Sequence, residues 1–301
     1  MVQVFLIYGW RGWIGGQFVE LLQTDESIRV VLGLSRVENI HDVMTELKYV
    51  NPTHVVSFIG RTHGTIGDKE YTTIDYLEQP GKLTENVRDN LFSPIVLANL
   101  SVQMGFHYTY MGTGCIFQYD ECHPYGKEEC GFDESSLPNF FGSGYSVVKG
   151  FTDQLMHMYE DTTLNVRIRM PITADLNPRN FITKILSYSK ICSVPNSMTV
   201  LPELLPILVD MVKAGRTGTI NLCNPGLVSH NEILEMYRET IDPTLSWGNF
   251  SEEEQNALLA AGRSNNYLNT DKLESIHPSV KDIRTSVRDV INRIHVLAEN
   301  V

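Results

Sequence analysis

The feature that most constrains the fold is a glycine-rich turn near the N-terminus. Residues 2–8 are mostly apolar, the profile of a buried parallel strand, and the segment YGWRGWIGG follows at once, before a predicted helix at 17–22. Glycines at positions 9, 12 and 15 let the backbone approach a pyrophosphate, and the helix N-terminus supplies N–H donors for it. The pattern predicts the first turn of a dinucleotide-binding domain; a tight turn that merely packs helix on strand is the simpler alternative.

Strands and helices alternate through the first 170 residues. Apolar runs at 29–34, 53–59, 106–111 and 164–170 predict four more strands, and the segments at 40–49, 82–104 and from 144 onward predict helices. Pro94 is a candidate position for a kink in the long helix. This alternation indicates an α/β fold with a doubly wound parallel sheet, a Rossmann-type domain over residues 1–170.

The alternation weakens beyond Pro171. Residues 181–189, 203–214, 230–239, 251–261 and 280–297 have helical patterns and 217–223 suggests a strand, but no second glycine-rich phosphate turn occurs. We interpret residues 171–301 mainly as a smaller substrate-binding lobe, with some elements that return to the Rossmann core.

Charge and cysteine content exclude several classes of protein. The 36 acidic and 24 basic residues give a formal net charge of −12, which argues against a nucleic-acid partner or an anionic membrane surface. No apolar run approaches the roughly 18 residues of a membrane span, and the N-terminus begins a strand rather than a signal peptide. Five cysteines without a CxxC pair suit a reducing compartment, so we expect a cytoplasmic protein without a metal site.

The end of the second predicted strand bears on the choice of cofactor. NAD sites usually place an acidic residue there, whereas an arginine accommodates the 2′-phosphate of NADP. This chain has Ser35-Arg36 and no carboxylate before Glu38, so NADPH is favoured over NADH, although the arginines could instead be solvated. The cofactor contacts predicted in this region are Gly9, Arg11, Gly12, Trp13, Ile14, Gly15 and Arg36.

A tyrosine and a lysine four residues apart, Tyr145 and Lys149, share one face of a predicted helix. An ammonium beside a phenol favours the phenolate, so we expect Lys149 to lower the pKa of Tyr145. Tyr145 would then move a proton to the oxygen of a carbonyl under reduction, while Lys149 also holds the nicotinamide ribose. Thr113 ends the preceding strand and completes the order of hydroxyl, tyrosine and lysine found in short-chain dehydrogenases.

Longer segments carry a resemblance to a known family. They are YGWRGWIGG, MGTGCIF, MPITADLNPRNFITKI, VPNSMTVLPELLPI, NPGLVSHNEILEMYR and RSNN, together with the Tyr145/Lys149 pair. They resemble the plant-type bifunctional UDP-4-keto-6-deoxy-glucose 3,5-epimerase/4-reductase of UDP-L-rhamnose synthesis, an extended short-chain dehydrogenase/reductase. More distantly, the chain is similar to bacterial dTDP-4-dehydrorhamnose reductase, which only reduces and has Thr-Asp-Tyr in place of Thr113-Gly114-Cys115.

The resemblance implies an NADPH-dependent enzyme that inverts C3 and C5 of a 4-keto sugar nucleotide and then reduces C4. Cys115 and Lys184 match the family's acid/base pair. The resemblance also implies a homodimer, paired through the helix that bears Tyr145. Further residues implied to contact the cofactor are Gly60 and Asn90, and those implied to contact the substrate are Arg179, Asn180, Arg263 and Asn265.

The residue types by themselves leave alternatives open. A cysteine at the end of a buried strand is usually an inert small hydrophobe, and a lysine such as Lys184 in an amphipathic helix is usually solvated. One alternative is therefore a 4-keto-sugar-nucleotide reductase without epimerase activity. Another is a non-catalytic regulatory subunit on a reductase fold, against which the complete set of Thr113, Tyr145 and Lys149 argues.

Overall fold

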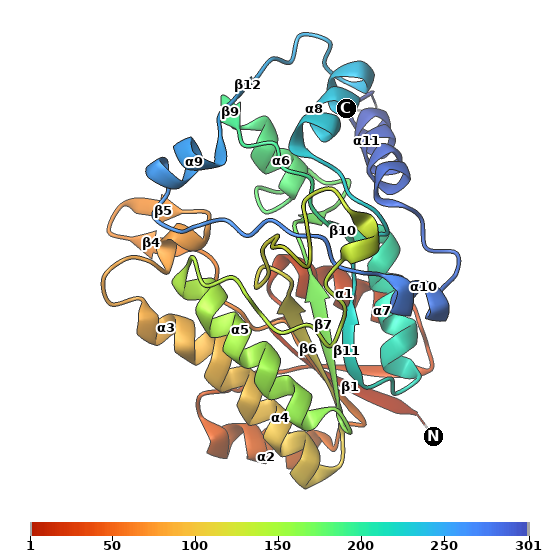
Figure 1. Ribbon diagram of the computed structural model, residues 1–301. Helices are drawn as coiled ribbons and strands as arrows, with labels where there is room; N and C mark the ends of the chain where they lie inside the picture. The colour runs from red at the N-terminus through yellow and green to blue at the C-terminus, as the bar shows by residue number, and fades with distance from the viewer. Residues whose placement is uncertain (1, 300–301) are drawn as a thin grey trace. The chain divides into compact units, whose positions relative to one another are not determined.

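A six-stranded sheet forms the centre of the fold in the computed structural model, which describes residues 2–299. The strand order is β11–β7–β6–β3–β1–β2 (Figure 1). Strand β1 (Gln3–Tyr8) pairs in parallel with β2 (Ile28–Leu32) and β3 (His54–Ser57), and β3 pairs in parallel with β6 (His107–Thr113). Strands β7 (Thr163–Ile168) and β11 (Gly218–Asn221) complete the sheet. The predicted doubly wound α/β fold is confirmed.

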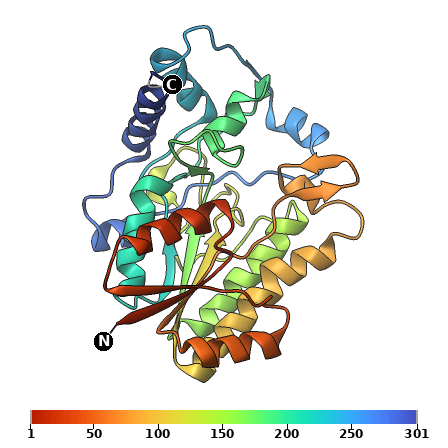
Figure 2. The ribbon, with the colours of Figure 1, turned by 180° about the vertical axis from the view of Figure 1, so that it is seen from behind.

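The alternation of side chains along β1 divides its neighbours between two layers. Leu6 and Tyr8 pack in one cluster with residues of α2 (Ile40–Val50) and α4 (Ser93–Met104). The opposite face of the sheet is covered by α1 (Trp13–Gln23), seen in front of the strands in Figure 2. There Phe18 of α1 contacts Phe58, with ring centroids 5.1 Å apart. Helix α5 (Gly144–Met156) lies beside α4 (Figure 1).

The long helix predicted over 82–104 is interrupted. It consists of α3 (Leu83–Val87), a π-helical turn (Arg88–Phe92) and α4. Pro94 has no N–H to donate to the carbonyl of Asn90, one turn earlier. The hydroxyl of Thr152 on α5 donates to that carbonyl instead, at 2.6 Å. Instead of the predicted kink at Pro94, the helix changes pitch in the turn that precedes the proline. The Thr152 hydroxyl takes the place of the missing N–H donor.

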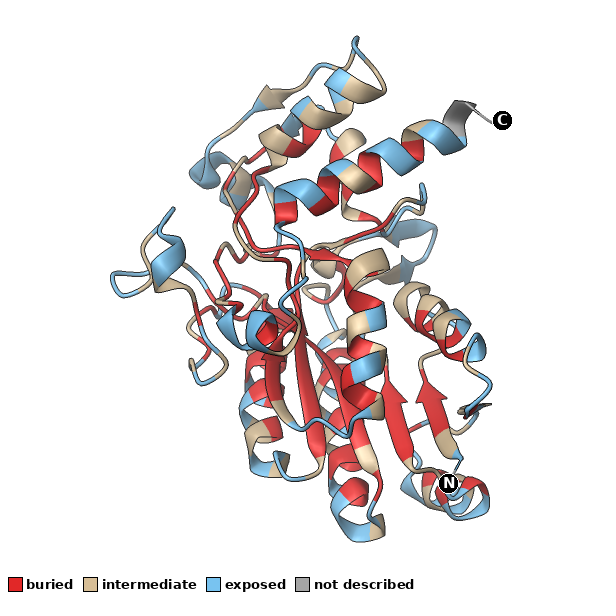
Figure 3. Ribbon diagram, turned by 90° about the vertical axis from the view of Figure 1, so that its right-hand side faces the viewer, coloured by how far each residue is buried: buried red, intermediate tan, exposed pale blue. Residues whose placement is uncertain are grey.

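The chain forms two compact units. The first contains the residues up to Ile116, Leu137–Arg167 and Leu205–Ile220, and the second contains Phe117–Ser136, Ile168–Leu204 and the described residues from Asn221 onward. Most of α7 (Leu201–Lys213) thus belongs to the first unit, together with most of β11. The inner strands β3, β6 and β7 are almost wholly buried (Figure 3), whereas the edge strand β2 has one buried residue, Ile28.

The second unit has its own apolar core. Helices α6 (Phe181–Leu186), α8 (His230–Thr240) and α11 (Ile283–Glu299) pack their buried faces together. Figure 3 shows α11 with buried and exposed faces in alternation, as expected for an amphipathic helix. Two short parallel ladders complete this unit: β8 (Pro171–Ile172) with β10 (Thr199–Val200), and β9 (Lys190–Ile191) with β12 (Gly248–Asn249). Helices α9 (Glu252–Leu258) and α10 (Asp271–Ile276) lie in the same unit.

Several elements differ from the predictions based on sequence. Strand β2 ends at Leu32, two residues before the end of the predicted run. An antiparallel hairpin of β4 (Gly64–Ile66) and β5 (Lys69–Tyr71) was not predicted, because each strand has only three residues and no apolar alternation. No helix among residues 2–299 has the length and apolar character needed to cross a membrane.

Candidate active site

The glycine-rich turn has the geometry that its glycines predicted. Gly9 has a φ of +72°, and a Cβ there would lie 2.7 Å from the carbonyl carbon of Phe58. A Cβ on Gly15 would lie 2.4 Å from the carbonyl oxygen of Gly9. Gly12 is the N-cap of α1, provides no capping side chain, and precedes a first turn without acidic residues. The helix N-terminus therefore suits an anion, and this turn fits the pyrophosphate of a dinucleotide.

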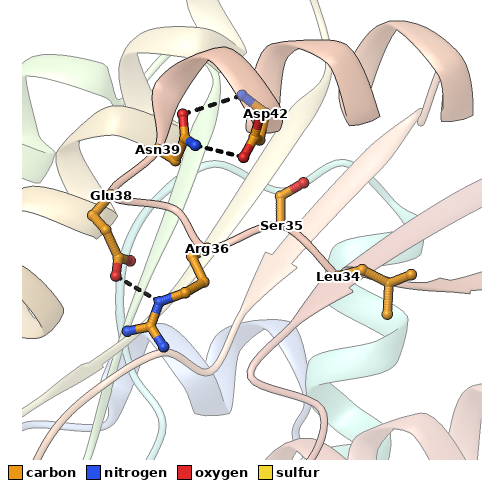
Figure 4. Close-up of a pocket in the computed structure, with 6 residues that line it drawn as sticks. All are labelled: Leu34, Ser35, Arg36, Glu38, Asn39 and Asp42. Carbon is orange, nitrogen blue, oxygen red and sulfur yellow. Dashed lines mark hydrogen bonds and ion pairs between the residues drawn. The ribbon is translucent and has the colours of Figure 1, made fainter.

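A pocket of about 420 Å³ lies at the end of β2 (Figure 4). Arg36 lies on its wall, with a side chain that is 70% exposed and forms a 2.6 Å ion pair with Glu38. The backbone N–H groups of Leu34 and Ser35 donate to the carboxylate of Glu46, at 2.7 and 3.2 Å. The loop is thus held by α2, and the guanidinium that was predicted to meet a 2′-phosphate already has an acidic neighbour. The pocket is lined by Leu34, Ser35, Arg36, Glu38, Asn39 and Asp42.

The second candidate phosphate ligand, Arg11, is supported by an aromatic residue. Its guanidinium lies 4.5 Å from the ring centroid of Trp10, a cation–π contact. The indole N–H of Trp10 donates to the carbonyl oxygen of Gly33 at 3.0 Å. Trp10 therefore links the glycine turn to the loop after β2, and the Arg11 guanidinium packs against the Trp10 ring.

Gly60 and Asn90 meet at the end of β3. The amide of Asn90 accepts a hydrogen bond from the backbone N–H of Arg61 at 3.0 Å and donates to the carbonyl of Arg61 at 2.9 Å. A Cβ on Gly60 would lie 3.3 Å from the Asn90 side-chain oxygen, a tight contact that glycine avoids. Asn90 fixes the loop after β3, and its contact with a cofactor stays a prediction.

Thr113, Cys115 and Tyr145 come together in the first unit. A hydrogen bond links the side chain of Thr113 to the phenol of Tyr145, and the backbone N–H of Cys115 donates to the Thr113 hydroxyl at 3.1 Å. Tyr145 packs against Tyr76 and Leu77, with Cys115 at the edge of the same apolar cluster. Burial raises the pKa of Tyr145, Cys115 raises it further, and the Thr113 hydrogen bond lowers it.

The expectation that Lys149 lowers the pKa of Tyr145 is therefore wrong for the free chain. The Lys149 ammonium donates a hydrogen bond to the phenol of Tyr110 on β6. Lys149 is 4% exposed, and burial lowers its pKa to about 7. The helix spacing of Tyr145 and Lys149 holds, but the direction of the lysine head group depends on the strand beneath the helix.

The N-terminus of α5 is anchored by residues that the sequence did not reveal as part of the site. Ser143 caps the helix by accepting from the N–H of Ser146 at 3.0 Å, and the Ser146 hydroxyl donates to the carbonyl of Cys115 at 2.7 Å. The carboxylate of Glu78 accepts from the N–H of Gly144 at 2.6 Å. A serine three residues before another serine can signal a helix cap, whereas a contact across 66 residues has no local signal.

Three cations gather in the second unit. Burial lowers the pKa of Lys184, and the charges of Arg179 and Arg263 lower it further. A group of like charges around this partly buried lysine suits a polyanionic ligand, such as the diphosphate of a nucleotide. Lys184 thus has charged neighbours rather than the fully solvated surroundings typical of an amphipathic helix. It belongs to a different unit from Cys115.

The two asparagines predicted to contact substrate have internal partners. Asn180 is fully buried, caps α6 by accepting from the N–H of Ile182 at 3.2 Å, and donates to the carbonyls of Thr173 and Asp175. The side-chain oxygen of Asn265 accepts from the amide of Asn196 at 2.9 Å. Their contact with substrate stays a prediction. In the described part of the chain, no group of three or more His, Cys, Asp or Glu side chains could hold a metal ion.

Comparison with known proteins finds relatives along the whole chain. No family model matches. The chain is similar to the protein L780 of Acanthamoeba polyphaga mimivirus, with 52% identity over 96% of this chain and 98% of the relative. The crystal structure of the L780 UDP-rhamnose synthase from this virus superposes with a TM-score of 0.92 at 51% identity, over 97% of this chain and 100% of that one.

Plant and bacterial proteins extend this comparison. The bifunctional dTDP-4-dehydrorhamnose 3,5-epimerase/dTDP-4-dehydrorhamnose reductase of Arabidopsis thaliana is 42% identical, over 94% of this chain and 90% of the relative. The dTDP-4-dehydrorhamnose reductase of Bacillus anthracis, solved in complex with NADP, has a TM-score of 0.78 over 99% of this chain and all of that one. Its sequence identity is 19%, so it supports the fold alone.

Proposed function

The chain belongs to the family of the viral UDP-rhamnose synthase and the plant bifunctional 3,5-epimerase/reductase, and from this premise we propose that it converts UDP-4-keto-6-deoxy-D-glucose to UDP-L-rhamnose with NADPH. The observation that carries the proposal is the assembly of Thr113, Cys115 and Tyr145 at the end of β6. A reductase needs the hydroxyl and the phenol, whereas the thiol adds a proton carrier that ketone reduction does not require.

The cofactor site follows from the glycine turn and the loop after β2. The N-terminus of α1, behind Gly9, Gly12 and Gly15, would hold the pyrophosphate, and Arg11 and Arg36 would meet the 2′-phosphate. Gly60 and Asn90 would line the cofactor site, and Trp13 and Ile14 supply the first N–H groups of the helix. Bound there, NADPH supplies the hydride for C4.

In the reduction, Tyr145 gives the proton that the C4 oxygen acquires. Its raised pKa keeps the phenol protonated at neutral pH, as an acid must be. Thr113 donates to the same oxygen or to the phenol, and Lys149 would hold the nicotinamide ribose.

Epimerisation requires an earlier exchange of protons at C3 and C5. Removing a proton beside the C4 ketone leaves an enolate, and a donor on the opposite face must return a proton. We assign these tasks to Cys115 and Lys184. Burial lowers the pKa of Lys184 and the charges of Arg179 and Arg263 lower it further, and the two arginines would bind the substrate diphosphate.

Deuterium exchange tests this function. With the 4-keto substrate and NADPH in D₂O, the wild-type chain should form UDP-rhamnose with deuterium at C3 and C5, measured by NMR. Cys115→Ala should suppress that incorporation by roughly 10²–10⁴-fold, the usual contribution of a general acid or base. It should still reduce a 4-keto sugar that is already epimerised.

Cys122→Ala is the matched control, since Cys122 is an exposed free thiol in the other unit. It should leave the exchange unchanged. Unchanged deuterium incorporation in Cys115→Ala would remove the thiol from the mechanism. Reduction without any incorporation in the wild type would favour the plain 4-keto-sugar reductase.

We also propose a cytoplasmic homodimer. None of the five cysteines, all of which lie among the described residues, forms a disulfide, which suits a reducing compartment. On and beside α5, Phe151 and Phe141 are each 56% exposed and Leu137 is 71% exposed, an apolar surface suited to a second copy. Light scattering should give twice the monomer mass for the wild type and the monomer mass for Phe151→Glu.

A further inference from the structure

Tyr110 is a buried phenol in the middle of β6 that the proposed reaction does not use. It is 1% exposed and faces the helices that cover this side of the sheet, as does Tyr108 two residues earlier. The phenol oxygen accepts a hydrogen bond from the ammonium of Lys149, whose Nζ lies 4.5 Å from the centroid of the Tyr110 ring. A residue on the sheet thus contacts the head group of the predicted site lysine.

The carboxylate of Asp153, whose charge acts on Lys149, has other hydrogen-bond partners. Asp153 lies one turn beyond Lys149 on α5, but its oxygens accept from the guanidinium of Arg167 at 2.9 and 2.7 Å and from the amide of Asn165 at 2.9 Å. Within residues 2–299, the Lys149 ammonium makes its hydrogen bond to Tyr110. Its direct partner is therefore a neutral group, although the field of Asp153 reaches it.

The groups around Lys149 act in opposite directions. Burial lowers its pKa to about 7, while Asp153 on the same helix and Cys115 after β6 raise it. Burial also raises the pKa of Tyr110 well above its ordinary value, and the neighbouring Tyr145, Tyr108 and Asp153 add to this effect. Tyr110 is consequently a neutral phenol throughout the physiological range, able to accept from an ammonium but not to neutralise it.

We propose that Tyr110 is a positioning residue, which keeps the Lys149 side chain protonated and directed at one place on the wall of the cofactor site. An ammonium moved out of water needs an acceptor, and the phenol provides one without forming an ion pair that would compete with a ligand. The inference rests on the proposed function, in which Lys149 holds the nicotinamide ribose.

Tyr110→Phe tests the inference, with Tyr108→Phe as the matched control from the same strand and the same face. NADPH fluorescence gives the dissociation constant between pH 6 and 9, and steady-state reduction gives the pH profile. In the wild type, we expect binding to weaken as pH rises and Lys149 loses its proton. In Tyr110→Phe, that inflection should move to lower pH by about one unit, a tenfold change in the protonation equilibrium. Tyr108→Phe should keep the wild-type inflection.

A double-mutant cycle separates positioning from a purely structural role. Lys149→Met should abolish the inflection, and Tyr110→Phe added to it should weaken NADPH binding no further. An unchanged inflection in Tyr110→Phe would overturn the inference, as would an equal loss of affinity with and without Lys149. A wild-type chain that does not bind NADPH would instead overturn the proposed function. Both phenylalanine variants keep their rings in the core, and circular dichroism checks their folding.

Discussion

Two lysines, one in each unit, have pKa values lowered mainly by burial, but the charges around them act in opposite directions. Lys149 lies between α5 and β6, where burial lowers its pKa to about 7 while Asp153 and Cys115 act against the shift. Lys184, on α6, has its pKa lowered by burial and then by Arg179 and Arg263. At Lys149 the neighbouring groups oppose the effect of burial on the pKa, whereas at Lys184 the like charges add to it.

The difference predicts how each lysine responds to a ligand. An anionic diphosphate would neutralise the arginines near Lys184, so binding should raise the pKa of that lysine. The neighbours of Lys149 are fixed parts of the α5–β6 layer, so its protonation depends on the fold more than on the substrate. Four experiments compare the two units, from the largest expected effect to the smallest.

The first variant, Tyr145→Phe, removes the proposed acid of the reduction, one turn before Lys149 on α5. Ketone reduction should fall by roughly 10²–10⁴-fold, because the C4 oxygen loses its proton donor. NADPH affinity, measured by fluorescence titration, should stay close to that of the wild type because the ring and its packing are kept. Near-normal turnover would show that Tyr145 is not the acid. The proposed reduction site beside Lys149 would then be wrong.

The second variant, Arg179→Gln, removes a cation from the neighbourhood of Lys184. The Michaelis constant for the sugar nucleotide should rise roughly 10- to 100-fold, the effect of losing one hydrogen bond between charged groups. The pKa of Lys184 should rise toward its usual value, so the pH profile of deuterium exchange should move to higher pH. Arg216→Gln, in the first unit, serves as a control. An unchanged profile would mean that the arginine does not tune the lysine.

The two units can also be compared by the loss of stability at low pH that one histidine in each unit should cause. Burial lowers the pKa of His54 in the first unit and of His230 in the second, each to about 4. The unfolded chain has a histidine pKa near 6.5, so it binds more protons than the folded chain between about pH 6.5 and 4. The free energy of unfolding should therefore decrease as the pH is lowered through this window, by a few kcal/mol in total.

Urea unfolding at pH 7 and pH 5 would measure this loss. His54→Phe and His230→Phe should each reduce the difference between the two pH values, whatever their stability at pH 7. If neither variant changes the difference, the acid loss arises elsewhere, for example from His107, whose pKa burial also lowers.

The smallest expected effect concerns the exposed ion pair at the end of β2. Glu38→Gln frees Arg36 for the 2′-phosphate, and exposed ion pairs contribute only about 0.2–1 kcal/mol. NADPH affinity should rise about twofold, with NADH affinity unchanged, in parallel titrations. If Arg36→Ala leaves the preference for NADPH intact, the residue that binds the 2′-phosphate would instead be Arg11, whose guanidinium packs on the Trp10 ring.

Local patterns determined the fold class and the identity of most candidate site residues. The glycine turn before α1 is confirmed in detail, because glycine spacing, the apolar strand and the helix start are adjacent in the chain. Tyr145 and Lys149 share a helix for the same reason, since a separation of four residues is one helical turn. The resemblance to the epimerase/reductase family likewise rests on contiguous segments, which sequence comparison detects directly.

Only the tertiary structure decided where these side chains point. Lys149 bonds to Tyr110, 39 residues earlier in the chain, and Gly144 is held by Glu78, 66 residues earlier. The π-helical turn before Pro94 depends on a hydroxyl from another helix, and Asn180 serves as a cap within a buried loop. Such contacts arise when strands and helices that are distant in sequence pack together, because burial forces each polar group to find whichever partner the packing brings near.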